Sequence, residues 1–411
     1  MKNLSITYSL ILLFLMALLE RMIFYGFRGV FVIHAISEDG LKLDYTSVDK
    51  LCNWFIVLVG IAPFFMGLIT DVWLRQKRAI FLGFGMLIAG FLVLLMDQSV
   101  YLSIALLVLG FGLVRVNLYI LLSWLFKRSD KKRDIGFMVL FIFIEIGGFL
   151  SFIPMSYFDT NLFFRGFDLF VLATLGSGIL FLMIQNKLSF SERYFPQKNE
   201  PKGLNDSILE LEKENEQYID LVPTPKLQLA LLMVGLFIFT FIMELAGIKM
   251  DALFKINGLN LYEVLKGNGF GYIVALVLLF VFARYRTETS NTWHQIAGFY
   301  LLFAFTILAI FTAIFLDNNY VLLWIIEYIM FTALTSIFAP LVMSFITRMS
   351  NSKYASSILG FYLTFPALAY GIMEVITLEI SPLVIFLCFV TTLFLSGVLF
   401  IGGNKLAQTM D

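Results

Sequence analysis

The feature that most constrains this chain is a succession of apolar runs, each long enough to cross a lipid bilayer. A helix needs about 20 mostly apolar residues to span about 30 Å of hydrocarbon. Twelve such runs can be marked, at roughly 6–35, 47–70, 78–97, 100–126, 135–158, 166–186, 227–250, 268–284, 293–316, 320–346, 354–378 and 382–402. The runs predict an all-α polytopic membrane protein with twelve transmembrane helices.

The composition agrees with this prediction. Of the 411 residues, 60% are hydrophobic and 14% are charged, whereas a soluble domain is about 45–50% apolar and about 25% charged. Basic and acidic residues number 29 each, so the chain lacks the excess of basic charge that a nucleic-acid partner requires. A disordered chain, a collagen and a disulfide-stapled secreted module are excluded as well.

One long polar segment divides the twelve runs into six and six. We expect a six-helix bundle over 1–186, a cytoplasmic linker over 187–226 and a second six-helix bundle over 227–411. Within the linker, the stretch that starts at Ser207 can form a short surface helix, and a flexible connection is the alternative.

Lys and Arg fall mostly on one side of such a membrane. If both termini are cytoplasmic, twenty of them lie on the inner side and six on the outer side. Because cytoplasmic loops carry the excess of Lys and Arg, both termini are predicted to be cytoplasmic, in an inner or plasma membrane. The first run continues past Phe31 with no small-residue cleavage site, so we expect a membrane helix there and not a removable signal.

Several ionisable side chains lie inside the apolar runs. Such a side chain at mid-bilayer costs about 2.5–3.5 kcal/mol on insertion scales, so each usually faces a partner or a wet cavity. The first run presents Arg21, Tyr25 and Arg28 on one helix face. The other acidic and basic residues deep in the runs are Glu20, Arg115, Glu145, Glu244 and Glu327.

Depth along the helices pairs some of these residues. Arg28 and Glu244 both lie about 9 Å below the predicted outer surface and can pair across the halves. Arg115 and Glu145 both lie about 15 Å from the cytoplasmic ends and can pair with each other or with Glu20. One interpretation is that static buried salt bridges fix the helix packing. We favour the other, a polar central cavity that holds a carboxylate-bearing solute on its arginines.

The remaining candidates point to no further chemistry. Cys52 and Cys388 are expected to be small buried hydrophobes, and His34 and His294 fall at predicted helix ends. No pair of His, Cys or carboxylate residues has metal-ligand spacing, so neither a metal nor a cofactor is expected. The glycines at positions 83, 85, 110, 112, 147 and 148 lie inside apolar runs, where we expect close helix contacts and not phosphate loops. No Ser/His/Asp or Cys/His arrangement for nucleophilic catalysis stands out, so we do not expect an enzyme.

The residues between the second and third runs resemble a known signature. Gly67-Leu-Ile-Thr-Asp71, followed by Arg75, Lys77 and Arg78, is similar to the loop motif of the major facilitator superfamily. In that superfamily two six-helix halves rock about a midplane site. The resemblance implies that Asp71 and these basic residues cap helix ends and lock the halves on the cytoplasmic side.

Three further segments resemble the proton-coupled oligopeptide transporter branch of that superfamily. Glu20-Arg21-Met-Ile-Phe-Tyr25-Gly-Phe-Arg28 resembles the first-helix pattern E-x-x-E-R-F-x-Y-Y-G with a further Arg. The segment from Gly110 to Asn117 looks like the fourth-helix G-x-G-x-x-K-P-N. The segment from Arg133 to Gly147 is similar to the fifth-helix R-D-x-G-F and N-x-G.

The resemblance also implies roles for single residues. The implied substrate-binding residues are Arg21, Tyr25, Arg28, Arg115, Asn117 and Glu145. The implied proton-coupling residues are Glu20, Glu145 and Glu244, and the implied outer gate is Arg28 with Glu244. The chain departs from the family at Ala17, Arg115, Glu145 and Thr335, where the family carries Glu, Lys, Asn and Glu. Because Arg cannot readily deprotonate, Arg115 is expected to be a permanent charge with Glu145 as its counter-ion.

The sequence therefore predicts a secondary transporter, working as a monomer, that moves small peptides or similar carboxylate-bearing solutes together with protons. Two alternatives stay open. One is a carrier of a different small solute, such as an organic anion, a conjugate or a drug, without the usual proton coupling. The other is a membrane receptor or partner subunit that keeps the fold and does not transport.

Overall fold

The described part of the chain is helical. The computed structural model describes residues 2–37, 41–96, 99–126, 132–151, 164–184, 226–256, 277, 298, 300–301, 303–304, 307, 337–350, 352–375 and 387–398. No strand occurs among these residues.

In the first half, the described helices follow the predicted runs closely. They are α1 (Lys2–Ile36), α2 (Tyr45–Ile69), α3 (Gln76–Leu95), α4 (Val100–Trp124), α5 (Lys132–Leu150) and α7 (Phe164–Ile184). A π-helical turn, η1 (Thr70–Leu74), extends α2. Asp44 starts α2 because its carboxylate accepts from the Ser47 backbone N–H at 3.0 Å, and Ser99 caps α4 in the same way.

In the second half, the described helices are α9 (Lys226–Ile256), α14 (Ala355–Leu363) and α15 (Phe365–Val375), with a short turn η3 (Ser352–Tyr354) before α14. Helical residues also cover 337–349 and 387–398. The predicted run 354–378 is interrupted at Thr364, because Pro366 has no backbone N–H to continue the helix.

The count of twelve helices and the division into two six-helix bundles stay predictions. Runs 268–284 and 293–316 and residues 187–225 of the linker lie almost wholly outside the described residues. Among the described helices, those long and apolar enough to cross a membrane are Tyr8–Ile36, Tyr45–Leu74, Gln76–Leu95, Val100–Trp124 and Ala355–Met373.

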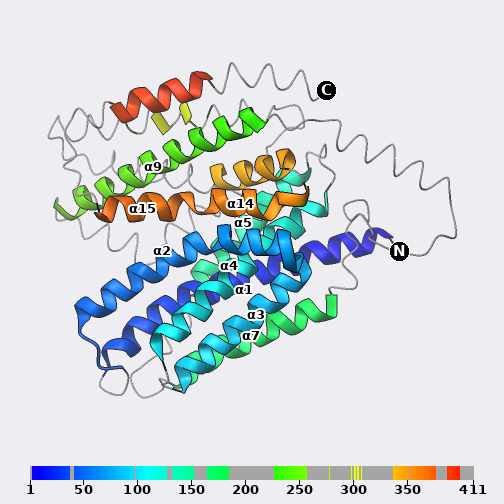
Figure 1. Cartoon of the computed structure of the whole chain (residues 1–411), viewed down its shortest axis with the longest axis vertical. Helices are drawn as coiled ribbons and strands as arrows, with labels where there is room; N and C mark the ends of the chain where they lie inside the picture. Colours follow the sequence, from blue (N-terminus) through cyan, green and yellow to red (C-terminus); the bar gives the residue numbers. More distant parts are fainter. Residues whose placement is uncertain are drawn as a thin grey trace.

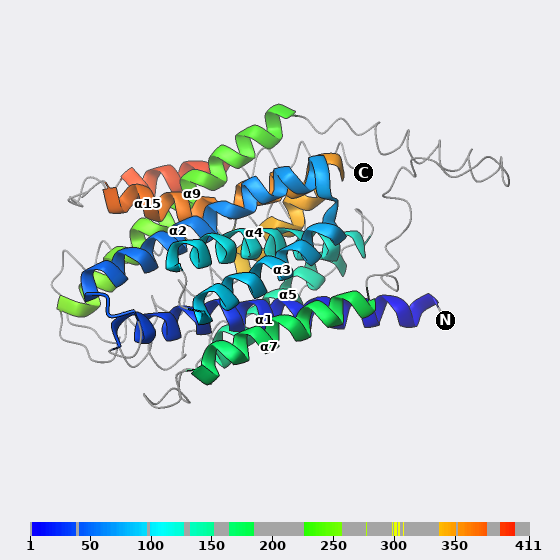
Figure 2. The same cartoon turned by 60° about the horizontal axis from the view of Figure 1, so that its bottom comes forward.

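The described helices lie side by side in two groups. Figures 1 and 2 show α1, α3, α4, α5 and α7 in one group, and α9, α15 and the segment 387–398 in the other. The helix α2 lies along the boundary, where it packs against α14 and α15 (Figure 1). Contacts between the halves are therefore concentrated on α2 and its neighbours.

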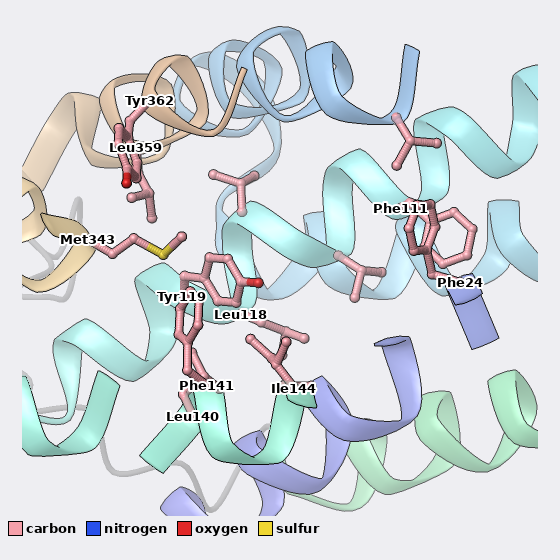
Figure 3. Close-up of a cluster of buried hydrophobic side chains, with 14 of the residues drawn as sticks. Phe24, Phe111, Leu118, Tyr119, Leu140, Phe141, Ile144, Met343, Leu359 and Tyr362 are labelled. Atoms are coloured by element: carbon pink, nitrogen blue, oxygen red, sulfur yellow. The ribbon is translucent and has the colours of Figure 1, made fainter. Parts of the chain in front are cut away.

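The helix α4 forms the centre of the first half. Its residues from Gly110 to Trp124 are all buried, which fits a helix that is apolar on every side. The apolar core continues from this helix across the boundary between the halves. Figure 3 shows one buried cluster that includes Leu118 and Tyr119 of α4 together with Met343, Leu359 and Tyr362 of the second half.

The prediction of close helix contacts at the glycines is confirmed at several positions. A Cβ atom added at Gly110 would lie 2.9 Å from the Gly83 carbonyl oxygen, closer than real Cβ atoms approach. At Gly147 the added atom would collide with the Leu18 carbonyl oxygen. The α3–α4 and α1–α5 contacts therefore require these glycines.

Candidate functional site

Glu20 joins α1 to α4 at the centre of the first half. Arg115 donates from Nε and Nη2 to Glu20 Oε1, at 3.2 and 3.0 Å. The Arg21 Nε atom lies 3.4 Å from the other oxygen, Oε2. Only 3% of the Glu20 side chain is exposed. One buried carboxylate is thus held between two guanidinium groups.

Aromatic residues complete this cluster. Arg21 Nη2 donates to the Tyr119 hydroxyl at 3.1 Å, and the Arg115 guanidinium lies over the Phe24 ring at 4.9 Å from its centroid. Tyr119 was not predicted as a site residue. The available signal was its position four residues after Arg115, which places both on one face of α4.

Glu145 is not the counter-ion of Arg115, and this prediction was wrong. The Arg115 guanidinium is engaged by Glu20, the alternative partner. Glu145 lies on α5, which approaches α1 so closely that a Cβ atom at Gly147 would be 3.1 Å from Arg21 Cβ. Arg21 is the cation that acts on the Glu145 carboxylate. Among the described residues, none forms a hydrogen bond or an ion pair with this half-buried carboxylate.

We name Glu20, Arg21, Arg115, Tyr119 and Glu145 the central cluster. Of the predicted substrate-binding residues, it brings together Arg21, Arg115 and Glu145. Tyr25 is half-buried next to it, with its ring edge-to-face against Phe24. Asn117 points elsewhere, because a helix turns by about 200° in two residues and so separates it from Arg115.

The predicted outer gate is not formed in this arrangement. Arg28 and Glu244 are both half-buried, and no ion pair joins them in the described part of the chain. Arg28 lies close enough to Cys52 of α2 to act on it electrostatically.

The segment from Gly67 to Arg78 is almost wholly helical, which corrects the expectation of a loop. Gly67 lies in the last turn of α2, Asp71 lies in η1, and Lys77 and Arg78 lie in the first turn of α3. Arg75 alone forms the turn between the helices, with φ at 61°. The helix continues as a π-helical turn over residues where a loop was expected.

Asp71 contacts the second half directly. Its Oδ2 atom accepts from the backbone N–H of Ser357 at 2.7 Å and from the Ser357 hydroxyl at 2.6 Å. Ser357 lies in the first turn of α14, so the carboxylate sits at the positive end of a helix in the other half. Arg75 and Arg78 are exposed and Lys77 is half-buried.

A chain of polar side chains continues from this contact into α4. Gln76 donates to the Ser356 hydroxyl at 3.1 Å, and Ser356 reaches the Asn117 amide oxygen at 3.5 Å. Asn117, which is fully buried, donates to the Thr70 hydroxyl at 3.0 Å. The structure therefore uses Asn117 to connect α2, α4 and α14.

The structure contains an ion pair across the halves that was not predicted. Arg348 Nη2 lies 3.0 Å from Asp134 Oδ1, and the Ser344 hydroxyl donates to the same oxygen. Only 1% of the Asp134 side chain is exposed. Asp134 belongs to the segment that resembles the fifth-helix motif, and nothing in the sequence places residue 348 beside it. We name Asp71, Gln76, Asn117, Asp134, Arg348, Ser356 and Ser357 the inter-half cluster.

A known family accounts for this arrangement of helices. The sequence model of the Major Facilitator Superfamily matches residues 11–373. The chain belongs to this superfamily. It is accordingly an integral membrane protein that crosses the bilayer several times.

The relatives found within the superfamily include peptide transporters. Peptide transporter YePEPT of Yersinia enterocolitica is 27% identical over 152 residues, which cover 35% of this chain and 30% of that protein. A di-/tripeptide transporter of Lactococcus lactis is 26% identical over 151 residues, with the same shares. The match thus spans less than a third of these relatives' own length.

Solved structures share the fold over nearly the whole chain. A POT family transporter in complex with a thioalcohol-conjugated peptide has a TM-score of 0.59 at 16% identity, covering 97% of this chain and 96% of that one. The human organic anion transporter has a TM-score of 0.61 at 12% identity, with 96% and 98% covered. At these identities the likeness shows the fold alone.

Metal ligands are not grouped in the described residues: no set of three His, Cys, Asp or Glu side chains there could hold an ion. Cys52 and Cys388 are free thiols that are half-buried. The described site therefore consists of guanidinium, carboxylate, amide and hydroxyl groups.

Proposed function

We propose that this protein is a secondary transporter that carries small peptides or similar carboxylate-bearing solutes together with protons by alternating access. Its membership of the superfamily and its similarity to peptide transporters support the transport class. The central cluster supplies guanidinium groups, which bind carboxylates bidentately.

The observation that carries the proposal is an asymmetry between two sides of the molecule. On the side of the α2–α3 turn, the inter-half cluster connects the halves through Asp71 and Asp134. On the other side, Arg28 and Glu244 are both present and do not pair. A carrier closed on one side and unpaired on the other is in one state of an alternating cycle.

The orientation of this state follows from the proposed topology. If the α2–α3 turn faces the cytoplasm, as the distribution of Lys and Arg predicts, the protein is closed toward the cytoplasm. A solute would then reach Arg21 and Arg115 from outside. Rocking of the halves would break the inter-half cluster and bring Arg28 and Glu244 together.

Uptake into proteoliposomes tests the proposal. A mixed pool of dipeptides and tripeptides is offered with an inward proton gradient, to wild type and to Arg21→Ala. We expect gradient-dependent uptake by wild type and its loss in the variant. Lys50→Gln is the matched control, because it removes an exposed cation outside the described clusters and should leave uptake unchanged. Folded wild-type protein that moves no peptide under the gradient contradicts the proposal.

A carrier of another organic anion is the second candidate. It is favoured by Arg115, a permanent cation where the peptide transporters of the family have Lys. A ligand that binds only the folded state raises its stability by RT ln(1 + [L]/Kd), so thermal-shift measurements compare ligand classes directly. Stabilisation by organic anions and not by peptides would favour this candidate.

A further inference from the structure

The two carboxylates of the central cluster have very different surroundings. Glu20 is almost fully buried and contacts the guanidinium groups of both Arg115 and Arg21. A proton on Glu20 would leave these two buried cations without their counter-ion, which is strongly unfavourable. Glu20 is thus the fixed counter-ion of these two guanidinium groups, in a contact that lies within one half.

Glu145, in contrast, is acted on by one cation, Arg21, and makes no direct contact with a guanidinium group in the described part of the chain. It is half-buried, and no ion pair or hydrogen bond to the described residues holds its carboxylate. Its position relative to Arg21 is set by the backbone, because Gly147 packs directly on α1. Protonation of Glu145 therefore breaks no direct contact.

The groups around Glu145 come from the helices packed against α5. Arg21 of α1 acts on Glu145. The ionisable side chains next to Arg21 are Glu20 and Tyr25 from α1 and Tyr119 from α4, and Arg115 of α4 is bound to Glu20. Arg348, on residues 337–349, is held by Asp134 at the other end of α5, eleven residues or about 16 Å away along the helix. Arg21 is consequently the cation for which Glu145 competes.

The charges of the central cluster balance without a solute. Glu20 and Glu145 carry two negative charges, and Arg21 and Arg115 carry two positive charges. A substrate carboxylate that binds Arg21 adds a third negative charge beside the guanidinium groups, because the ammonium group of a dipeptide lies at the other end of the molecule. One proton restores the balance, and Glu145 is the carboxylate that can accept it at least cost.

We propose that Glu145 carries the coupling proton, by exchanging its interaction with Arg21 for that of the substrate carboxylate, while Glu20 serves as a positioning residue for Arg21 and Arg115. The proposal rests on the proposed transport function. A proton from the water on one side adds to a Glu145 carboxylate oxygen, and Arg21 then binds the incoming carboxylate. On the other side the carboxylate leaves, and Glu145 returns the proton to water and takes up Arg21 again.

Charge movement follows from this exchange. A zwitterionic dipeptide carries no net charge, so each cycle moves one proton and therefore one positive charge. The proposal expects one proton per substrate carboxylate.

Two transport assays separate the roles of the two carboxylates. Glu145→Gln imitates the protonated residue, so it should lose uptake driven by a proton gradient by at least about tenfold while it still exchanges labelled for unlabelled dipeptide across the membrane. Glu145→Asp should keep gradient-driven uptake. Glu20→Gln should lose both activities. Gradient-driven accumulation by Glu145→Gln at the wild-type level would overturn the proposal.

An infrared titration keeps this test independent of the substrate. The purified wild-type protein is titrated with acid, and the amplitude of its carboxylic-acid C=O band is compared with that of Glu145→Gln, because all 29 Asp and Glu residues contribute to the band. We expect wild type and Glu20→Gln to show a titrating component that Glu145→Gln lacks. If wild type moves no peptide but shows this component, the proposed function fails and the assignment of Glu145 stands. A titrating amplitude that is unchanged in Glu145→Gln, or reduced in Glu20→Gln, contradicts the assignment.

Discussion

Two buried ion pairs of this protein have nearly the same geometry and opposite places in the fold. Glu20 and Arg115 lie 3.0 Å apart within the first half, and Asp134 and Arg348 lie 3.0 Å apart across the two halves. The carboxylate side chains are 3% and 1% exposed. The distance and the burial of the carboxylate therefore do not distinguish a contact that must persist from one that must break.

The elements that each pair connects do distinguish them. The helices α1 and α4 belong to one bundle, and their contact is independent of how the halves are arranged. The Asp134 pair, like the Asp71 contact with Ser357, exists only while the halves meet on that side. The first pair should contribute mainly to stability, and the second mainly to the balance between conformations.

Removal of Arg115 is expected to have the largest effect. Arg115→Ala leaves Glu20 buried with one weaker partner, and loss of one member of a buried pair costs about 3–5 kcal/mol. Thermal unfolding of the purified variant in detergent measures this loss. Arg115→Lys keeps a positive charge, so its unfolding temperature should lie between those of wild type and Arg115→Ala. A variant Arg115→Ala that unfolds at the wild-type temperature would show that the pair inside the half is not structural.

A side chain at Gly67 should strain only the closed arrangement. Gly67 lies directly against the Ser356 carbonyl group in the other half, and neither backbone can give way. Overpacking of this kind costs about 1–3 kcal/mol. Gly67→Ala should therefore open the α2–α3 side. Gly85→Ala is the matched control, because an added Cβ atom there meets no atom within 4 Å.

A thiol probe reports this opening. Ala355→Cys, in a background with Cys52→Ser and Cys388→Ser, places a thiol at the buried start of α14. A membrane-impermeant reagent added on the α2–α3 side should label it faster with Gly67→Ala than with Gly85→Ala. Equal labelling rates would mean that the two halves do not depend on this close contact.

Loss of the Asp134 pair should give a smaller shift in the same direction. Arg348 is 20% exposed, so solvent weakens the pair, and we expect Asp134→Asn to shift the equilibrium by about 1–2 kcal/mol, roughly a tenfold change in population. The same thiol probe measures it as faster labelling. Exchange of the charges, Asp134→Arg with Arg348→Asp, should restore the slow rate. If Asp134→Asn labels at the wild-type rate, the pair between the halves does not hold them.

The helices and part of the central cluster were predictable from the sequence. Membrane helices follow from local apolar runs, and the first-half helices lie close to the predicted bounds. The side chains of Glu20, Arg21 and Arg115 were expected to face protein because an isolated charge is costly in lipid. That expectation needs only depth and helix rotation, and both can be counted along one chain.

The choice of partners could not be predicted in the same way. Arg115 lies at a similar depth to Glu145 and pairs with Glu20, because the rotation of α1 and α5 about their own axes decides which carboxylate meets it. Asp134 and Arg348 are 214 residues apart, and their contact depends on how the halves are docked. Asn117 was assigned to the substrate by motif, whereas its face of α4 lies against α2 and α14.

The smallest effect is expected at Asp44, which offers a local contrast to Asp71. Both carboxylates accept from the first turn of a helix, but Asp44 caps its own helix, α2. Hydrogen bonds from the Ser47 and Thr46 hydroxyls and from the Ser47 backbone N–H lower the pKa of Asp44 from its ordinary 3.8 to about 2. The stability that this carboxylate contributes is therefore present above its ordinary pKa, and it is lost as the pH falls through about 2.

Asp44→Ala should accordingly lower the unfolding temperature slightly at neutral pH, and the difference from wild type should shrink on acidification toward pH about 2. The labelling rate at Ala355→Cys should not change. The Asp44 cap lies within the first half, so its loss affects both arrangements of the halves equally. Asp71→Asn should do the reverse, with a faster labelling rate and little change in unfolding temperature. If Asp44→Ala alters labelling as much as Asp71→Asn does, contacts within a half also set the balance between conformations, and the distinction between the two kinds of contact fails.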